Sequence, residues 1–182
     1  SAGWPRRLES VLAEPARAAA RVPLEEPVGE QQQPVAGRDV QLVLCVGAPD
    51  TPELAHEVNG LIAELRRTRE GVVVIEGMIP RREVTQILSA ATVFACPSVY
   101  EPLGIVNLEA MACGTAVIAS NTSSMPEVVG REDALFDPKD TASITRKMQQ
   151  ALTDERFRLS LKEHGPRQAA KFSWENSAKL SI

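Results

Sequence analysis

Two glutamates, Glu101 and Glu109, stand eight residues apart and are the side chains of this chain best suited to recognising a polar ligand. The apolar, β-favouring run 92–97 precedes them, and the sequence from Ile105 onward has helical character. Glu101 is therefore expected on the loop that leaves a buried parallel strand, where open α/β sheets bind ligands. The carboxylate of Glu109 only accepts hydrogen bonds, so two vicinal hydroxyls, such as those of a ribose, are its natural partners.

Gly104 stands between the two glutamates and leaves the backbone open to a ligand. The amides that follow it, at Ile105 and Val106, point out of a predicted helix start and suit a phosphate or a sugar oxygen. These residues also have plainer interpretations: a solvated loop carboxylate for Glu101, a helix N-terminal acid favoured by the macrodipole for Glu109, and a turn for Gly104.

A set of motifs around these residues resembles a known enzyme family. The segment 98–117, with the sequence SVYEPLGIVNLEAMACGTAV, resembles the E-x7-E motif of the family-4 retaining glycosyltransferases, in the subgroup similar to bacterial glycogen and maltose-1-phosphate synthases. The resemblance extends over about 39–174 and includes the segments 40–47, 125–129 and 134–138. It therefore rests on four ordered motifs, whereas a lone pair of glutamates would indicate almost nothing.

The resemblance implies a GT-B fold, in which two Rossmann-like domains face each other, the first holding the acceptor and the second the nucleotide-sugar donor. This chain matches the second domain. By the same resemblance, Glu101 is the catalytic-site residue that contacts the donor sugar hydroxyls, and Glu109 binds the ribose. Main-chain groups of further residues are implied to bind phosphate and sugar (Leu103, Gly104, Ile105 and Val106) and the nucleobase (Met78 and Ile79).

Another motif of the family is not found in the sequence. The family's donor domain opens with a Gly-Arg-x4-Lys-Gly loop, whose Arg and Lys neutralise the diphosphate. Here the Gly-Arg pair 37–38 runs directly into the next predicted strand, so 35–38 is either a vestige of that loop or a coincidence. Arg81 and Arg82, at a predicted helix start, are interpreted as solvated charges, with phosphate contact as the alternative. Because the last helix also stops at Ile182, the chain is expected to be truncated or rearranged at both ends.

The chain divides at about residue 39. Five prolines are spaced through the charged and Gln-rich residues 1–38, so this part is expected to be a poorly ordered arm. Residues 39–182 are expected to form an α/β, Rossmann-like, nucleotide-sugar-binding domain with a doubly wound, mostly parallel sheet. Its strands are predicted at 40–46, 72–76, 92–96, 116–119 and 134–136, and its helices at 52–67, 82–90, 105–112, 126–129, 141–152 and 154–172. Asp140 is predicted to cap the helix 141–152.

Composition argues against several other classes of protein. The formal charge of −4 in 182 residues argues against a nucleic-acid partner, and no apolar run reaches the length of a membrane span. Cys45 and Cys96, in predicted buried strands, and Cys113, near a helix end, are interpreted as small apolar side chains of a protein from a reducing compartment, which predicts a cytoplasmic location. His56 and His164 stand far apart, so no metal site is expected.

The first functional hypothesis is the donor-binding domain of a retaining glycosyltransferase. It would use ADP- or UDP-glucose to extend an α-glucan or to glycosylate a sugar phosphate, as in glycogen biosynthesis. The expected partners are the nucleotide-sugar, a glucan or sugar acceptor and a separate N-terminal acceptor domain, with no cofactor besides the donor.

Two other hypotheses belong to different classes. One is a non-catalytic, truncated or rearranged nucleotide-binding module, and the other is a structural or regulatory Rossmann-like domain that binds nothing. Nucleophilic hydrolysis is not supported, because no His or Asp stands where a triad with the polar loop of Ser120, Thr122, Ser123 and Ser124 could be argued.

Overall fold

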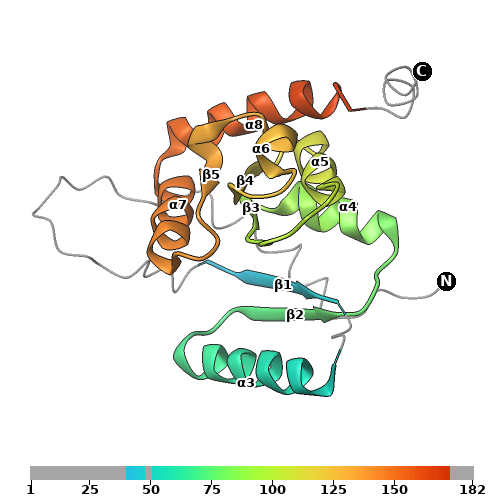
Figure 1. The fold of residues 1–182 in the computed structure, drawn as a ribbon, viewed down its shortest axis with the longest axis vertical. Helices are drawn as coiled ribbons and strands as arrows, with labels where there is room; N and C mark the ends of the chain where they lie inside the picture. Colours follow the sequence, from blue (N-terminus) through green and yellow to red (C-terminus); the bar gives the residue numbers. More distant parts are fainter. Residues whose placement is uncertain (1–39, 48–50, 173–182) are drawn as a thin grey trace, which may run out of the picture. The chain divides into compact units, whose positions relative to one another are not determined.

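The computed structural model describes residues 40–47 and 51–172 (Figure 1). The predicted arm, residues 1–38, lies outside the described residues. The chain forms two compact units, Ser1–Pro80 and Arg81–Ile182. Both Glu101 and Glu109 therefore belong to the second unit.

The described part of the first unit is a β–α–β segment. Its elements are β1 (Leu42–Val46), α3 (Pro52–Thr68) and β2 (Val72–Glu76). The two strands pair in parallel, with Leu42 opposite Val72. Thr51 caps α3, because its hydroxyl accepts a hydrogen bond from the Leu54 amide at 3.2 Å.

The second unit contains a three-stranded parallel sheet and the buried core. Its elements are α4 (Arg81–Ala90), β3 (Val93–Cys96), α5 (Ile105–Ala112), β4 (Ala116–Ser120), α6 (Met125–Val129), the 3-10 helix η1 (Glu132–Ala134), β5 (Leu135–Phe136), α7 (Thr141–Thr153) and α8 (Glu155–Ala169). β4 is the middle strand, with β3 and β5 as its parallel neighbours. All five residues of β4 are buried, as is typical of a parallel strand covered by helices.

Helix α8 closes the core of the second unit. It runs along the top of this unit in Figure 1 and packs on α5, α6 and β4. Gly165 of α8 approaches α5 so closely that a Cβ on it would lie 3.1 Å from the Met111 carbonyl oxygen. Gln168 of α8 caps the C-terminal end of α6, since its Nε2 donates to the carbonyl oxygens of Glu127 at 3.0 Å and Val128 at 3.2 Å.

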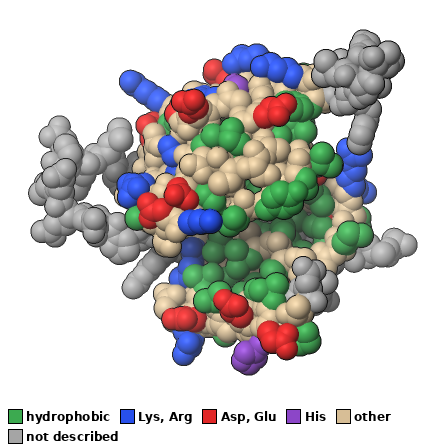
Figure 2. Space-filling view, viewed as in Figure 1, with side chains coloured by type: hydrophobic (Ala, Val, Ile, Leu, Met, Phe, Trp, Pro, Cys, Tyr) green, Lys and Arg blue, Asp and Glu red, His purple; other side chains and the backbone are tan. Residues whose placement is uncertain are grey.

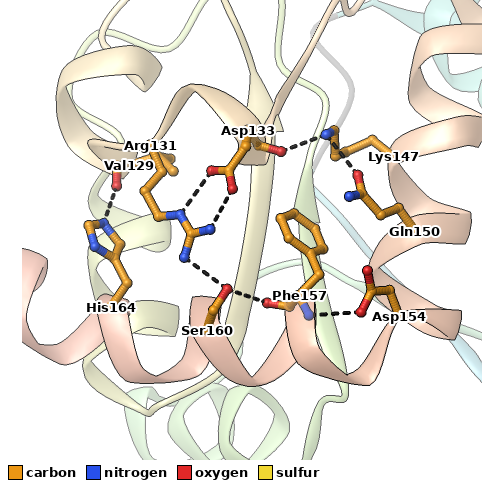
Figure 3. Close-up of polar contacts among 9 residues, drawn as sticks. All are labelled: Val129, Arg131, Asp133, Lys147, Gln150, Asp154, Phe157, Ser160 and His164. Atoms are coloured by element: carbon orange, nitrogen blue, oxygen red, sulfur yellow. Dashed lines mark hydrogen bonds and ion pairs between the residues drawn. The ribbon is translucent and has the colours of Figure 1, made fainter.

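A polar cluster joins the segment after α6 to α7 and α8 (Figure 3). The Arg131 guanidinium makes two contacts with the Asp133 carboxylate, and its Nη1 donates to Ser160 Oγ at 3.0 Å. The cationic groups of Arg131 and Lys147 lie 5.9 and 5.4 Å from the centre of the Phe157 ring. The hydrogen bonds from Arg131 lower the pKa of Asp133, and the same hydrogen bonds raise the pKa of Arg131.

The order of strands and helices predicted from the sequence is confirmed. The largest difference in bounds is at α8, which ends at Ala169 and not at 172. Every strand pair among the described residues is parallel, which confirms the α/β class, and the pairs form a two-stranded sheet in the first unit and a three-stranded sheet in the second. Asp140 caps α7 as predicted, accepting a hydrogen bond from the Ala142 amide at 2.9 Å.

The prediction for Cys45 is wrong. Successive side chains of a strand point to opposite faces, and Cys45 is exposed between the half-buried Leu44 and Val46. Cys96 is buried at the end of β3, as predicted, and Cys113 is half-buried directly after α5.

Charges of both signs are scattered over the face shown in Figure 2, so neither sign dominates that face. No helix in the described ranges is long and apolar enough to cross a membrane. Within residues 40–47 and 51–172, no three His, Cys, Asp or Glu side chains converge as metal ligands would.

Replacing Gly165 with Ala tests the contact between α8 and α5. We expect a lower free energy of unfolding, by about 1–3 kcal/mol, because the new methyl group meets backbone atoms of Met111. Gly60→Ala is the matched control, since a Cβ there meets nothing within 4 Å and alanine favours a helix. Urea unfolding of both variants measures the difference, and equal stabilities would show that the α5–α8 contact is loose.

The lowered pKa of Asp133 predicts a pH-dependent contribution to stability. A carboxyl whose pKa is lower in the folded state stabilises that state above its unfolded pKa, and the contribution disappears as the pH falls through the folded value. Asp133→Asn should therefore lower the melting temperature at pH 7, by an amount that shrinks below about pH 4. The loss in free energy of unfolding at pH 7 should be about 1 kcal/mol, because the Asp133 side chain is 55% exposed and solvent screens the ion pair.

Melting curves of the parent and of Asp133→Asn between pH 7 and pH 3 check this expectation. Glu132→Gln is the control, as an exposed acid of the same turn, and should show no comparable loss. A difference between parent and Asp133→Asn that stays constant down to pH 3 would rule out the ion pair as its cause.

Candidate functional site

The predicted site starts in the loop between β3 and α5. Glu101 folds back onto the start of α5, where its Oε1 accepts a hydrogen bond from the Gly104 amide at 3.1 Å. Gly104 has a φ of +64°, in the left-handed region that glycine adopts without strain. A Cβ at this position would lie 3.1 and 3.2 Å from the two methyl groups of Val128 in α6. Glycine is thus required here by the backbone conformation and by the neighbouring helix.

The first turn of α5 presents amide groups next to Glu101. The first N–H groups of a helix have no acceptor within that helix, and Ile105 and Val106 provide two of them here. Such groups suit a phosphate or a sugar oxygen. Leu103 and Ile105 are exposed by 62% and 48%. The roles predicted for both residues involve main-chain groups and not these side chains.

Glu109 lies further along α5 and faces the start of α4. One oxygen of its carboxylate is 4.0 Å from Arg81 Nε. The Arg81 side chain is 88% exposed and that of Glu109 is 35% exposed, so water and salt screen the pair and it adds little to stability. The Glu109 carboxylate therefore keeps its capacity to accept hydrogen bonds from a diol. Arg81 is solvated, as predicted, and also lies beside a carboxylate of the site.

The loop between β4 and α6 fixes the start of the loop that follows β3. Ser120 Oγ donates to the carbonyl oxygen of Ser98 at 2.6 Å. Thr122 Oγ1 donates to the carbonyl oxygen of Val99 at 2.9 Å. The two loops at the carboxyl ends of neighbouring parallel strands are thus joined by hydroxyl to carbonyl hydrogen bonds.

The same serine-rich loop also binds the backbone of Glu101. Ser123 Oγ and Ser124 Oγ donate to the Glu101 carbonyl oxygen at 2.9 and 2.6 Å. Sequence reasoning considered this loop only as part of a hydrolytic site and missed its contact with Glu101. The signal that was present is the run of consecutive hydroxyl side chains directly after a predicted strand.

Asn107 is a further residue that the sequence analysis did not single out. It lies in α5 and is fully buried, with Nδ2 3.3 Å from the sulfur of Met125, the first residue of α6. Its Oδ1 has no hydrogen-bond partner among the described residues. A polar residue between the apolar Val106 and Leu108 of the predicted helix was the available signal, because buried polar groups require partners.

Met78 and Ile79 belong to the first unit and follow β2 directly. Gly77 precedes them with a φ of +77°, and the Met78 side chain is fully exposed while that of Ile79 is half-buried. Their contact with a nucleobase stays a prediction, as do the ligand contacts of Glu101 and Glu109.

Comparison with known proteins identifies the family. Residues 40–168 match the model of the glycosyl transferases group 1. Alpha-maltose-1-phosphate synthase of Mycolicibacterium smegmatis is 46% identical over 153 residues, which are 79% of this chain and 40% of that protein. The serotype-specific mannosyltransferase WbdA of Escherichia coli is 41% identical over 121 residues, which are 66% of this chain and 15% of that protein. The chain thus spans less than half the length of these relatives.

Solved structures of similar fold agree with this assignment. Sucrose-phosphate synthase of Thermosynechococcus elongatus matches with a TM-score of 0.65 and 33% identity, over 78% of this chain and 36% of that one. The Anabaena protein HepE, in complex with UDP-glucose, matches with a TM-score of 0.65 and 20% identity, over 78% of this chain and 40% of that one. This chain therefore belongs to the group 1 glycosyl transferases, and its fold is a Rossmann-like part of the GT-B architecture.

Proposed function

We propose that this chain is the donor-binding part of a retaining glycosyltransferase that uses a nucleoside-diphosphate sugar. The observation that carries the proposal is the arrangement at the start of α5, where Glu101 binds the Gly104 amide and Glu109 follows on the same helix. The donor would be ADP- or UDP-glucose, and the acceptor an α-glucan or a sugar phosphate. Relatives named alpha-maltose-1-phosphate synthase and sucrose-phosphate synthase support a sugar phosphate as substrate or product class.

The proposed chemistry assigns a role to each group of the site. Glu101 uses one oxygen for the Gly104 amide, and its remaining acceptor capacity serves the hydroxyls of the donor sugar. The amides of Ile105 and Val106 receive the diphosphate, on which negative charge grows as the bond to the sugar breaks. Glu109 accepts hydrogen bonds from the ribose diol, and Met78 and Ile79 meet the nucleobase through main-chain groups.

The proposed site has few positive charges to neutralise the diphosphate. The sequence has no Gly-Arg-x4-Lys-Gly loop, and the side chain of Arg81, the basic residue beside Glu109, is 88% exposed. This observation favours a second candidate function, a nucleotide-binding module that does not catalyse transfer. For the first candidate, the partner that would supply the acceptor site is a separate N-terminal domain, and we place its reaction in the cytoplasm, in glycogen biosynthesis.

Glu109→Gln tests the ribose contact. The substitution keeps the shape of the side chain and removes its charge, so nucleotide binding should weaken by about 1.5–3 kcal/mol while the melting temperature stays the same. Calorimetric titration with ADP-, UDP- and GDP-glucose measures the affinity, and Glu163→Gln, an exposed acid on α8, is the control. Unchanged affinity in Glu109→Gln would reduce Glu109 to a surface acid paired with Arg81.

A transfer assay can exclude the second candidate function, the module that does not catalyse transfer. We expect the chain alone to bind the donor no more tightly than high micromolar, because the amides at one helix terminus offset only about 0.3–1 kcal/mol per charge. We also expect no transfer, because holding an acceptor in line with the donor is worth about 7–11 kcal/mol and needs the facing domain.

The assay supplies radiolabelled ADP- or UDP-glucose and an α-glucan primer, with Glu101→Ala as the control. Labelled glucan above that control would exclude the non-catalytic module and would mean that other residues provide the phosphate site. No labelled glucan, together with measurable donor binding, would agree with the expected inactivity of the chain alone.

A further inference from the structure

The backbone of the loop that carries Glu101 is held by polar contacts and not by burial of its side chains. Val99, Tyr100 and Leu103 are exposed by 52%, 78% and 62%. Apolar packing therefore contributes little to the position of this loop. The hydroxyl groups of Ser123 and Ser124 donate to the Glu101 carbonyl oxygen, and the Ser124 amide donates to the same oxygen at 3.5 Å.

The Ser124 hydroxyl contacts Glu101 and does not cap its own helix, α6. It is the N-cap residue of α6, a position where a serine hydroxyl commonly accepts a hydrogen bond from the second or third amide of the helix. Here the Ser124 side chain makes no capping hydrogen bond, and its Oγ lies 2.6 Å from the Glu101 carbonyl oxygen. Its hydroxyl therefore serves the neighbouring loop and not its own helix.

Ser123 makes its contact from a strained backbone conformation. Its φ is +56°, and among the described residues it is the only one other than glycine with a positive φ. A non-glycine residue in this region persists only where the surrounding structure holds it, and such residues cluster at functional sites. The strain places the Ser123 hydroxyl 2.9 Å from the Glu101 carbonyl oxygen.

We infer that Ser123 and Ser124 are positioning residues for Glu101. Together they fix its carbonyl oxygen, and the carboxylate of the same residue then reaches the Gly104 amide. One carboxylate oxygen, Oε1, is engaged with that amide. This inference deepens the proposed function: that Glu101 is positioned for a donor sugar rests on that function. The positioning itself can be tested without a donor.

The test compares Ser123→Gly, Ser124→Ala and the double variant by amide hydrogen exchange at Gly104, measured by NMR. Each lost hydrogen bond should raise the exchange rate of the Gly104 amide by about three- to tenfold, because the Glu101 carboxylate leaves it more often. Ser123→Gly should melt no lower than the parent, since glycine relieves the strain of the positive φ. If Ser123 only stabilised the fold, Ser123→Gly would not combine faster exchange at Gly104 with an undiminished melting temperature.

Two further variants serve as controls. Ser124→Thr keeps the hydroxyl and should restore slow exchange at Gly104. Ser143→Ala removes a half-buried hydroxyl of α7 that accepts a hydrogen bond from the Asp137 amide at 3.2 Å, so it should leave Gly104 exchange unchanged. Unchanged exchange at Gly104 in a folded double variant would overturn the inference.

Titration with UDP-glucose separates the inference from the proposed function. If the parent chain binds UDP-glucose, the double variant should bind it about tenfold or more less tightly at an unchanged fold. If the parent binds neither UDP-glucose nor ADP-glucose while Gly104 exchange follows the variants as expected, the proposed function fails and the positioning of Glu101 stands. Equal affinity of parent and double variant would show that the position of Glu101 does not matter to the donor.

Discussion

The close approach of α6 to the turn at Gly104 is the constraint on which the candidate site depends. The methyl groups of Val128 lie where a side chain at residue 104 would begin, so α5 can start beside α6 only with glycine in the left-handed conformation. That start brings the Gly104 amide to the carboxylate of Glu101 and sets the direction of the helix that carries Glu109. The amide that Glu101 binds and the helix that carries Glu109 are thus placed by packing in which neither glutamate takes part.

Helix α6 cannot supply this packing by itself. It has five residues, and helices of that length are not stable without tertiary contacts. Its carbonyl end is bound by Gln168 and by His164, whose Nε2 lies 2.8 Å from the Val129 carbonyl oxygen (Figure 3). The ion pair of Arg131 with Asp133 then holds the segment that follows α6 against α8 through Ser160. A helix far along the chain from the glutamates is in this sense part of their support.

The features that the sequence could predict are those set by local patterns. The apolar run of β4, the cap at Asp140 and the turn at Gly104 are each set by a few neighbouring residues, and all three were predicted, whereas the close approach of Val128 to Gly104 was not. The contacts of Ser123 and Ser124 with Glu101 join segments about twenty residues apart, which no local pattern encodes. Cys45 was misjudged because the exposure of a strand face depends on what covers it, and not on the strand itself.

The contacts by which α8 caps α6 join residues far apart in the chain, so they form late in synthesis and folding. Gln168 and Glu127 are 41 residues apart, and His164 and Val129 are 35 apart. Pairings of such separation form after the local helices and strands, because the intervening chain must first be closed into a loop. On the ribosome, the E-x7-E segment is therefore synthesised well before the helix that steadies it. A nascent chain that ends before α8 carries both glutamates and lacks the contacts of Gln168 and His164 with α6.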